Sequence, residues 1–303
     1  MGKLEDMALL VEVAEAGGLS AAGRRLSLSP ATMTARLKAI EERYQTRLFH
    51  RSTRSITLTR AGEEFYHAAL RVLEEVRHAE SLLTQKEGVL SGNIRLSAPS
   101  DFGRQYLSPA VVEFSRHHPD VKFFISLREH VEDLVANRLD MSVRFGNLPD
   151  SSLVVKNIRP NHRVLVASGA YLTAHGVPAT FAELAHHRCL ALESQGVVMN
   201  EWRFETEGKE TVIRVDPAMV CDDGALLRQW ALSGAGIAGK SWWDVKDDVE
   251  TGRLTVLFAD SFTGFSRYDR KDVGLQFVYP QRTLQPLQVT AFSQFFLDWL
   301  KKQ

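Results

Sequence analysis

Residues 20–40 read SAAGRRLSLSPATMTARLKAI, and this stretch predicts a helix, a tight turn and a second helix. Ser20 suits the N-cap of the first helix, and the alanine, arginine and leucine residues that follow are good helix formers. Segment 27–29 interrupts the helical pattern. Ser29 suits the N-cap of the second helix, with Pro30 at the first helical position, where no amide donor is needed. Two helices joined by so short a turn are typical of a helix-turn-helix.

The second helix is expected to have one apolar face and one polar face. Its apolar residues recur at the spacing of one helix face, and they are Met33, Leu37, Ile40 and Tyr44. The opposite face shows Thr32, Ala35, Arg36 and Lys38. A helix that offers small polar and basic groups is the part of a helix-turn-helix that enters the major groove of DNA.

The flanking segments complete a small DNA-binding module. Apolar residues over 4–14 predict a first helix, which the glycines at 17–18 end. After the second motif helix, the apolar alternation over residues 56–58 predicts a β-wing with Arg51 and Arg54 near its tip. A basic wing would grip phosphate or the minor groove, although the same arginines would also serve solubility.

A long helix is predicted from Thr59, its N-cap, to about Glu87. Apolar residues recur along it in a heptad-like pattern, and they are Phe65, Ala69, Val72, Val76, Ala79 and Leu83. This seam predicts a dimer interface, which would place two basic helices on two half-sites about one DNA turn apart. The alternative is that the seam packs against its own domain.

Charge is distributed unevenly along the 303 residues, although the chain has no net charge. Residues 20–60 contain nine arginine and lysine residues and two glutamates, a net charge of +7, so the remainder carries −7. This asymmetry indicates a DNA-binding module on a neutral-to-acidic body, the alternative being a merely solvated basic face. No apolar run approaches the roughly 20 residues of a membrane span, and the N-terminus lacks a signal-peptide core. A cytoplasmic protein is therefore expected.

In combination, these features resemble the LysR-type transcriptional regulators. The resemblance rests on motifs between Leu4 and Phe65 and continues more loosely to the C-terminus. The motifs are AEAGGLSAAGRRLSLSPATMT, LKAIEE, RLFHR and LTRAGE. The resemblance implies a winged helix-turn-helix followed by a periplasmic-binding-protein-like effector domain, whose inducers in the family are small metabolites, often organic acids or aromatics.

By position, the resemblance implies DNA contacts from the helix-turn-helix and the wing. The expected contact residues are Ser20, Pro30, Ala31, Thr32, Thr34, Arg36, Lys38, Arg51 and Arg54. Many relatives carry arginine directly after the residue that matches Thr34, whereas this chain has Ala35 followed by Arg36. Which side chain reads guanine is therefore open. A second departure is Lys240, which replaces a commoner Leu-Pro ending of its segment.

Beyond a linker predicted at residues 91–93, the pattern changes to alternating strands and helices. Strands are predicted over 94–98, 121–127 and 141–145, with helices near 106–117 and 130–137. A strand at 163–167 would cross into a second lobe, a strand at 272–279 would return, and a helix near 285–301 would cover the first lobe. Such repetition implies α/β sheets, which bind ligands at the carboxyl ends of their strands. Two lobes with two crossings form a cleft that can close on a small molecule.

Six residues are candidates for the effector cleft: Ser100, Phe102, Arg128, Arg144, Phe145 and Asp222. Ser100 and Phe102 rest on loop position and family pattern, and a helix beginning near Asp101 would aim free amides at a carboxylate. Arg144 is the best-placed cation because a guanidinium can clamp a carboxylate, the alternative being a surface salt bridge. Asp222 matches a family contact position, but capping of a helix that begins at Asp223 would also explain it.

Motifs for other chemistry are weak. The glycines of 234–239 match G-x-G-x-x-G, but a helix over 223–232 precedes them where a dinucleotide site needs a strand. Hydrolase, zinc-protease and P-loop signatures do not occur. The histidine pairs at 117–118 and 186–187 lie at helix ends, and adjacent residues point apart, so no metal is expected. The two cysteines, Cys189 and Cys221, are interpreted as buried thiols rather than a redox switch.

We therefore predict a homo-oligomeric, effector-responsive transcriptional regulator that is not an enzyme. The expected domains are a winged helix-turn-helix over 1–58, a linker helix over 59–91 and an effector domain over 92–303. Its lobe I would cover about 92–163 and 272–303, and its lobe II about 164–271. The expected partners are promoter DNA, a small effector such as a carboxylate, further copies of the chain as dimer or tetramer, and RNA polymerase, with no cofactor. The rival hypothesis is an α/β enzyme or metabolite-binding protein whose N-terminal module only dimerises, in which the +7 segment has no role.

Overall fold

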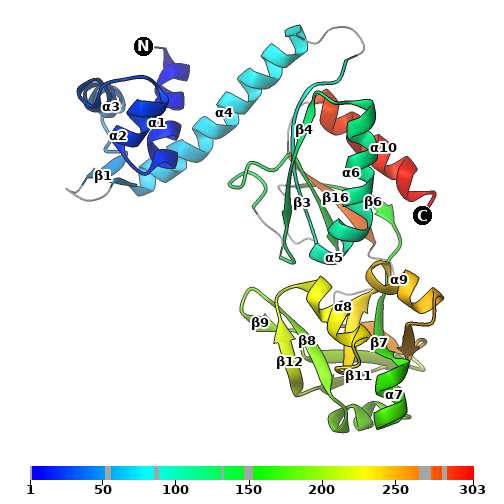
Figure 1. Cartoon of the computed structure of the whole chain (residues 1–303). Helices are drawn as coiled ribbons and strands as arrows, with labels where there is room; N and C mark the ends of the chain where they lie inside the picture. Colours follow the sequence, from blue (N-terminus) through cyan, green and yellow to red (C-terminus); the bar gives the residue numbers. More distant parts are fainter. Residues whose placement is uncertain are drawn as a thin grey trace. The chain divides into compact units, whose positions relative to one another are not determined.

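In this computed structural model the chain divides into two structural units, Met1–Val89 and Leu90–Gln303 (Figure 1). The structure describes residues 2–51, 56–84, 89–130, 133–146, 153–265, 274–281 and 285–303. The first unit comprises α1 (Lys3–Ala16), α2 (Leu19–Arg25), α3 (Pro30–Tyr44), β1 (Phe49–Arg51), β2 (Ile56–Leu58) and α4 (Arg60–Thr84). These elements confirm the predicted helix-turn-helix, the wing and the long helix.

The caps of the motif helices agree only in part with the sequence. The Ser29 hydroxyl accepts a hydrogen bond from the amide of Thr32 at 3.2 Å, which confirms the N-cap of α3. The expected N-cap at Ser20 is wrong, because Gly18 has that role and Ser20 lies in the first turn of α2. The helix starts earlier because the amide of Ala22 already bonds the Gly18 carbonyl, at 3.0 Å.

The apolar face of α3 forms the centre of the first unit. Met33, Leu37 and Ile40 are buried, as predicted, and they pack with residues of α1 and the start of the wing. Glu41 fixes the wing to α3, because its Oε1 accepts the amides of Leu48 and Phe49 at 2.9 and 3.2 Å. The strands β1 and β2 pair antiparallel, and the expected contact Arg54 at the tip of the wing lies outside the described residues.

The N-terminal half of α4 packs within its own unit. The Thr59 hydroxyl accepts the amide of Gly62 at 3.0 Å and so caps the helix, as predicted. Ala69 and Leu70 are buried against Val11 of α1. The predicted seam therefore has two parts. Its first residues pack against α1, whereas Val72 is 38% exposed.

In the second unit, lobe I is a five-stranded sheet in the order β4-β3-β5-β16-β6. Strands β3 and β4 and strands β3 and β5 pair parallel, as predicted, whereas β16 runs antiparallel to both its neighbours. Helices α6 and α10 lie side by side against the sheet in Figure 1, and aromatic residues such as Phe114, Phe292 and Phe296 fill the space between. Its elements are β3 (Gly92–Ala98), α5 (Ser100–Phe102), a π-helix (Gly103–Leu107), α6 (Ser108–His117), β4 (Val121–Leu127), β5 (Met141–Phe145), β6 (Leu153–Arg159), β16 (Leu275–Pro280) and α10 (Leu287–Leu300).

Lobe II contains a second sheet in the order β12-β8-β13-β7-β14 and a smaller sheet β11-β10-β15. The crossing from β6 to β7 runs through residues 160–162. It is held to lobe II by a hydrogen bond between the Ser241 hydroxyl and Asn161 Oδ1, at 2.6 Å.

The elements of lobe II are β7 (Arg163–Ser168), α7 (Gly169–His175), a 3₁₀ helix (Phe181–His186), β8 (Cys189–Ser194), β9 (Val197–Val198), β10 (Glu201–Thr206), β11 (Lys209–Arg214), β12 (Pro217–Cys221), α8 (Gly224–Leu232), β13 (Ile237–Ser241), α9 (Trp242–Glu250), β14 (Leu254–Leu257) and β15 (Phe262–Gly264).

Two predicted segments differ in the structure. The linker expected at 91–93 is wrong for its last two residues, because Gly92 and Asn93 already pair with Val121 and Lys122 as part of β3. The helix expected near 130–137 is also wrong: the described part, from Asp133 onward, forms hydrogen-bonded turns. Asp133 accepts the amides of residues 135 and 136 at 2.9 and 3.0 Å, which stabilises a single turn instead of a longer helix.

The glycine-rich motif has the structural role that the sequence indicated. It follows α8 and leads into β13, so a helix precedes it where a dinucleotide site needs a strand. A Cβ atom at Gly236 would lie 2.2 Å from the carbonyl oxygen of Arg188, so this position requires close backbone packing.

Candidate functional site

The outer surface of α3 carries most of the expected DNA-contact residues. The side chains of Pro30, Ala31, Thr34 and Lys38 are exposed, and Thr32 and Arg36 are half-buried. Ser20 of α2 is also exposed. The surface therefore combines small residues, which let a helix approach bases closely, with two cations.

Hydrogen bonds within α3 engage several of these polar groups. The Thr34 hydroxyl donates to the carbonyl of Pro30 at 2.9 Å, and Lys38 lies 3.4 Å from Glu42 in an exposed ion pair. Arg36, in contrast, forms no ion pair with any residue in the described part of the chain. Its charge is therefore available to a nucleic acid. Of Arg51, only the backbone in β1 is described.

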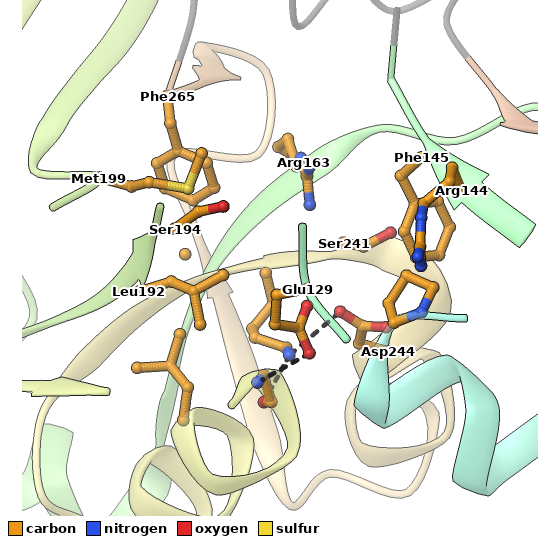
Figure 2. Close-up of a pocket in the computed structure, with 15 residues that line it drawn as sticks. Glu129, Arg144, Phe145, Arg163, Leu192, Ser194, Met199, Ser241, Asp244 and Phe265 are labelled. Carbon is orange, nitrogen blue, oxygen red and sulfur yellow. Dashed lines mark hydrogen bonds and ion pairs between the residues drawn. The ribbon is translucent and has the colours of Figure 1, made fainter. Parts of the chain in front are cut away.

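A second candidate site lies between lobes I and II, where the carboxyl ends of β3, β4, β5 and β8 meet. A cavity of about 100 Å³ is lined there by Pro99, Glu129, Arg144, Phe145, Arg163, Leu192, Ser194, Met199, Gly224, Leu227, Gly239, Lys240, Ser241, Asp244 and Phe265. Figure 2 shows Glu129 between Leu192, Ser194 and Met199 on one side and Arg144 and Phe145 on the other. The location agrees with the rule that α/β sheets bind ligands at strand carboxyl ends.

Arg144 lines this cavity but is itself 2% exposed. Its Nη2 donates to the hydroxyl of Ser97 at 2.7 Å, and its Nη1 donates to the carbonyl of Arg128 at 3.1 Å. The guanidinium is therefore fixed in place by the sheet, so the surface salt bridge that the sequence left open is not its environment. Phe145, the next residue, also lines the cavity.

Ser100 does not line the cavity itself but connects the two lobes beside it, next to the lining residues Pro99, Glu129 and Gly224. Its hydroxyl oxygen lies 2.5 Å from Glu129 Oε1 and 2.8 Å from Asp223 Oδ1, and it accepts the amide of Ala225 at 3.2 Å. Burial would raise the pKa of Asp223, but the hydrogen bonds from Ser100 and from the amides of α8 outweigh it and lower the pKa. Asp223 is therefore ionised at the N-terminus of α8, where the helix dipole favours negative charge.

Lys240 is the centre of a buried ionic cluster behind Ser100. Its Nζ lies 3.0 Å from Asp101 Oδ2 and 3.1 Å from Asp244 Oδ2, and it donates to the carbonyl of Gly224 at 2.7 Å. Burial alone would lower the pKa of Lys240, but Asp244 and Asp101 raise it above its ordinary value. Burial raises the pKa of Asp101 to about 6, although Lys240 opposes the shift. Because Asp101 belongs to lobe I and Lys240 to lobe II, this pair couples the lobes.

Arg163 is a cation at the crossing between the lobes, and sequence reasoning did not select it. Its guanidinium carbon lies 6.0 Å from the ring centroid of Phe145 in lobe I and 5.6 Å from that of Phe265 in lobe II. Figure 2 shows the side chain in the middle of the cavity wall. Cation–π contacts of this kind attract a guanidinium to the face of an aromatic ring.

Three expected effector residues lie elsewhere. Phe102 is fully buried in the lobe I core, where its ring packs against those of Tyr106 and Phe296, so it does not line the cavity. Arg128 contributes its carbonyl oxygen to Arg144, while its side chain is exposed and outside the cavity lining. Asp222 is exposed, and the helix cap assigned to it is wrong, because Asp223 accepts the amides of α8.

The described residues also bear on the metal and redox sites that the sequence raised. In the part of the chain that the structure describes, no group of three or more His, Cys, Asp or Glu side chains is arranged to hold a metal ion. Cys189 is buried, and burial raises the pKa of its thiol to about 12, which suppresses the thiolate. Burial also raises the pKa of Cys221. Among the described helices, none is long and apolar enough to cross a membrane.

Comparisons with known proteins agree with this architecture. Residues 4–63 match the bacterial regulatory helix-turn-helix proteins of the lysR family, and residues 87–301 match the LysR substrate binding domain. The chain is similar to the HTH-type transcriptional activator TtdR of Escherichia coli strain UTI89, with 30% identity over 99% of this chain and 94% of the relative.

Solved structures give the same result. The full-length virulence activator AphB of Vibrio cholerae shares 26% sequence identity, with a TM-score of 0.61 over 98% of this chain and 99% of that one. CrgA from Neisseria meningitidis, a LysR-type transcriptional regulator, shares 25% identity, with a TM-score of 0.62 over 98% of both chains. These relatives are transcriptional regulators and not enzymes, which removes the rival hypothesis. The chain belongs to the LysR family of DNA-binding transcriptional regulators, and it joins a winged helix-turn-helix to an effector-binding domain.

Proposed function

We propose that this regulator responds to a small organic acid that binds in the cavity between lobes I and II. The observation that carries the proposal is the set of three cations in the cavity wall: Arg144, Arg163 and Lys240. The acidic residues of the same wall are Glu129 and Asp244, and Lys240 is paired with Asp244 and with Asp101 behind the wall. A carboxylate ligand would meet guanidinium groups in this wall, to which charge-assisted hydrogen bonds are strong.

The remaining walls favour a short carbon skeleton. Leu192, Met199 and Phe265 give the cavity an apolar side opposite its charged one. Its volume of about 100 Å³ is smaller than the roughly 150 Å³ of an engineered cavity that binds benzene. A ligand of a few heavy atoms with one or two carboxylates fits this space and chemistry.

A thermal-shift screen tests the effector class. Small mono- and dicarboxylates should raise the unfolding temperature of the full-length protein, because a ligand that binds only the folded state stabilises it. The matched amides should leave the temperature unchanged. A panel in which amides and carboxylates act alike would contradict the proposal of an organic acid.

We also propose that α3 lies in the major groove and that the wing contacts the DNA backbone. The candidate contacts remain those of the sequence, with Arg36 as the first residue to test. Phosphate contacts should supply most of the affinity, so the logarithm of the binding constant should fall linearly with the logarithm of the salt concentration.

The proposed assembly is a homodimer or homotetramer that acts on promoter DNA in the cytoplasm, together with RNA polymerase. The partly exposed seam on α4 at Val72 and Val76 supports pairing of the helices. The sheet edge of lobe I gives a second apolar surface, because Phe124 and Ile125 of β4 are 43% and 42% exposed. Closure of the lobes on the effector would then alter the geometry between copies and the bend of the DNA, by analogy with other members of the family.

A further inference from the structure

Glu129 follows β4 and extends into the cavity between the lobes. Its Oε1 accepts hydrogen bonds from the Ser100 amide and the Gly224 amide, both at 3.0 Å, and it lies 2.5 Å from the Ser100 hydroxyl oxygen, whose single proton it shares with Asp223. Ser100 belongs to lobe I and Gly224 to lobe II, so one oxygen atom joins both lobes. We call these three donors, the Ser100 hydroxyl and the amides of Ser100 and Gly224, the cradle.

The cradle has the composition of a carboxylate receptor. It offers two backbone amides and a hydroxyl to one acceptor oxygen. The nine-residue helix α8 directs its N-terminus toward that oxygen. A side chain at Gly224 would crowd the cradle. Its Cβ atom would lie 3.0 Å from Glu129 Oε1 and 3.2 Å from Lys240 Nζ, so the ends of both side chains would have to move.

All the hydrogen bonds that hold Glu129 in the cradle come from neutral groups, although the charge of Lys240 is close by. It forms no ion pair with any described residue, because Lys240 is engaged by Asp101 and Asp244. Its second carboxylate oxygen, Oε2, makes no hydrogen bond within the described part of the chain. The side chain is half-buried and lines the cavity, so a ligand can reach it. Another carboxylate could therefore take its place without breaking a salt bridge.

The charges around Lys240 are compatible with this exchange. Burial lowers the pKa of Lys240, but Asp244, Asp101 and Glu129 together raise it. An effector carboxylate that replaces Glu129 carries the same charge, so the negative charge beside Lys240 is kept.

We propose that the cradle is the carboxylate-binding end of the effector cavity and that Glu129 occupies it as a built-in ligand until an effector carboxylate displaces it. This inference rests on the proposed function, in which the effector is a small organic acid. No covalent bond changes: the two amide hydrogen bonds, and the share of the Ser100 hydroxyl proton, pass from Glu129 Oε1 to an oxygen of the ligand. The bridge between the lobes then depends on the ligand instead of on the chain.

Chemical rescue of the emptied cradle tests the proposal. In full-length Glu129→Ala, the cradle loses its occupant, and formate or acetate should bind there and raise the unfolding temperature in a saturable manner. We expect these ions to bind the variant about tenfold or more tightly than the wild type, in which Glu129 competes. Titration calorimetry and thermal unfolding measure both quantities at constant ionic strength set with chloride.

Three controls isolate the cradle. Formamide and acetamide match the ions in size but lack the charge, and they should not rescue Glu129→Ala. Glu129→Gln keeps the cradle filled and should bind formate no better than the wild type. Glu183→Ala removes a matched carboxylate on the surface of lobe II, where Glu183 accepts the Ala179 amide at 2.9 Å and the Thr180 hydroxyl at 3.1 Å. Formate should not rescue that variant.

Failure of this inference and failure of the proposed function give different results. Equal formate affinity in Glu129→Ala and wild type, or equal rescue by acetamide, would overturn the role of Glu129. So would a Glu129→Ala variant that binds formate and acetate more weakly than the wild type. Saturable rescue in Glu129→Ala supports the cradle even if no carboxylate of the screen binds the wild type, a result that would count against the proposed effector class alone.

Discussion

Arg36 differs from the other polar residues of α3 in its surroundings. It lies beside the buried face, four residues after Thr32 and one before the buried Leu37, and its side chain is half-buried. Lys38 has Glu42 as a partner, and the hydroxyl of Thr34 is bound to the backbone. A guanidinium without an ion-pair partner among the described residues is suited to bind guanine through two parallel hydrogen bonds.

Replacement of Arg36 by alanine should weaken operator binding by about 1–3 kcal/mol and relax specificity at one base pair, because one base contact is lost. Binding to a set of single-base operator variants, measured by fluorescence anisotropy, checks both effects. Arg116→Ala, at an exposed site on α6, is the charge-matched control and should have little effect. A loss that is equal for every operator variant would make Arg36 a phosphate contact instead.

Protonation of Asp101 should make the free energy of unfolding depend on pH. Burial raises its pKa from an ordinary value of 3.8 to about 6, so the folded state binds its proton more tightly than the unfolded state. The stabilisation from this proton is complete below about pH 4 and is lost as the pH rises through about 6. It amounts to roughly 3 kcal/mol at about 1.4 kcal/mol per pKa unit.

The unfolding free energy of the wild type, relative to Asp101→Asn, should therefore fall between pH 4 and pH 7. Urea unfolding followed by tryptophan fluorescence measures it, because all five tryptophans lie beyond residue 200 in the second unit. A difference between the two proteins that does not vary with pH would contradict the pKa assigned to Asp101.

At the scale of elements, the α4 seam explains how one helix can serve two contacts. Its first turns are packed on α1 through Ala69 and Leu70, whereas Val72, Val76 and Ala79 are not buried by their own unit. The heptad spacing identifies all the apolar residues of the seam. It does not show which of them pack against α1, because that depends on how far α1 extends along α4.

A charge in the exposed part of the seam should weaken dimerisation. Val72→Glu would place an unpaired charge in the helix pair, which is costly once water is excluded. We expect the dimer dissociation constant, from sedimentation equilibrium, to rise by about tenfold or more. Arg71→Glu puts the same side chain on a neighbouring face of α4 and should change it little. An unchanged association state in Val72→Glu would argue against pairing through α4.

Sequence patterns predicted most elements because local chemistry decides them. Ser29 and Pro30 start α3, and the apolar spacing of Met33, Leu37 and Ile40 defines its buried face. The helix expected near 130–137 failed because Asp133 satisfies its neighbours' amides in a single turn, and no periodicity reveals that competition.

The effector cavity was only partly predictable. Strand ends indicated Arg144 and Phe145, which line the cavity, and Ser100, which lies beside it, because the carboxyl ends of parallel strands meet at one edge. Glu129 directly follows the expected Arg128, so the same rule could have found it. Lys240 and Arg163 could not be found in this way, since Asp101 and Phe145 of lobe I become their neighbours only when both lobes have formed.

At the scale of the whole molecule, the two units divide the work. The first presents a basic helix and wing, and the second encloses a cavity whose walls come from both lobes. The segregation of charge, +7 over residues 20–60 against −7 in the remainder, keeps the DNA affinity in one unit. The binding constant should accordingly depend steeply on salt, with a slope that reports the number of phosphates contacted.

Binding of the full-length protein to the intergenic DNA upstream of its own gene tests the central claim most directly. Fluorescence anisotropy should be compared with a shuffled sequence of equal length over a series of salt concentrations. We expect the intergenic DNA to bind about a thousandfold or more tightly than shuffled DNA at physiological salt, with both affinities falling as salt rises. Equal affinity for the two DNAs at every salt concentration would contradict a sequence-specific regulator.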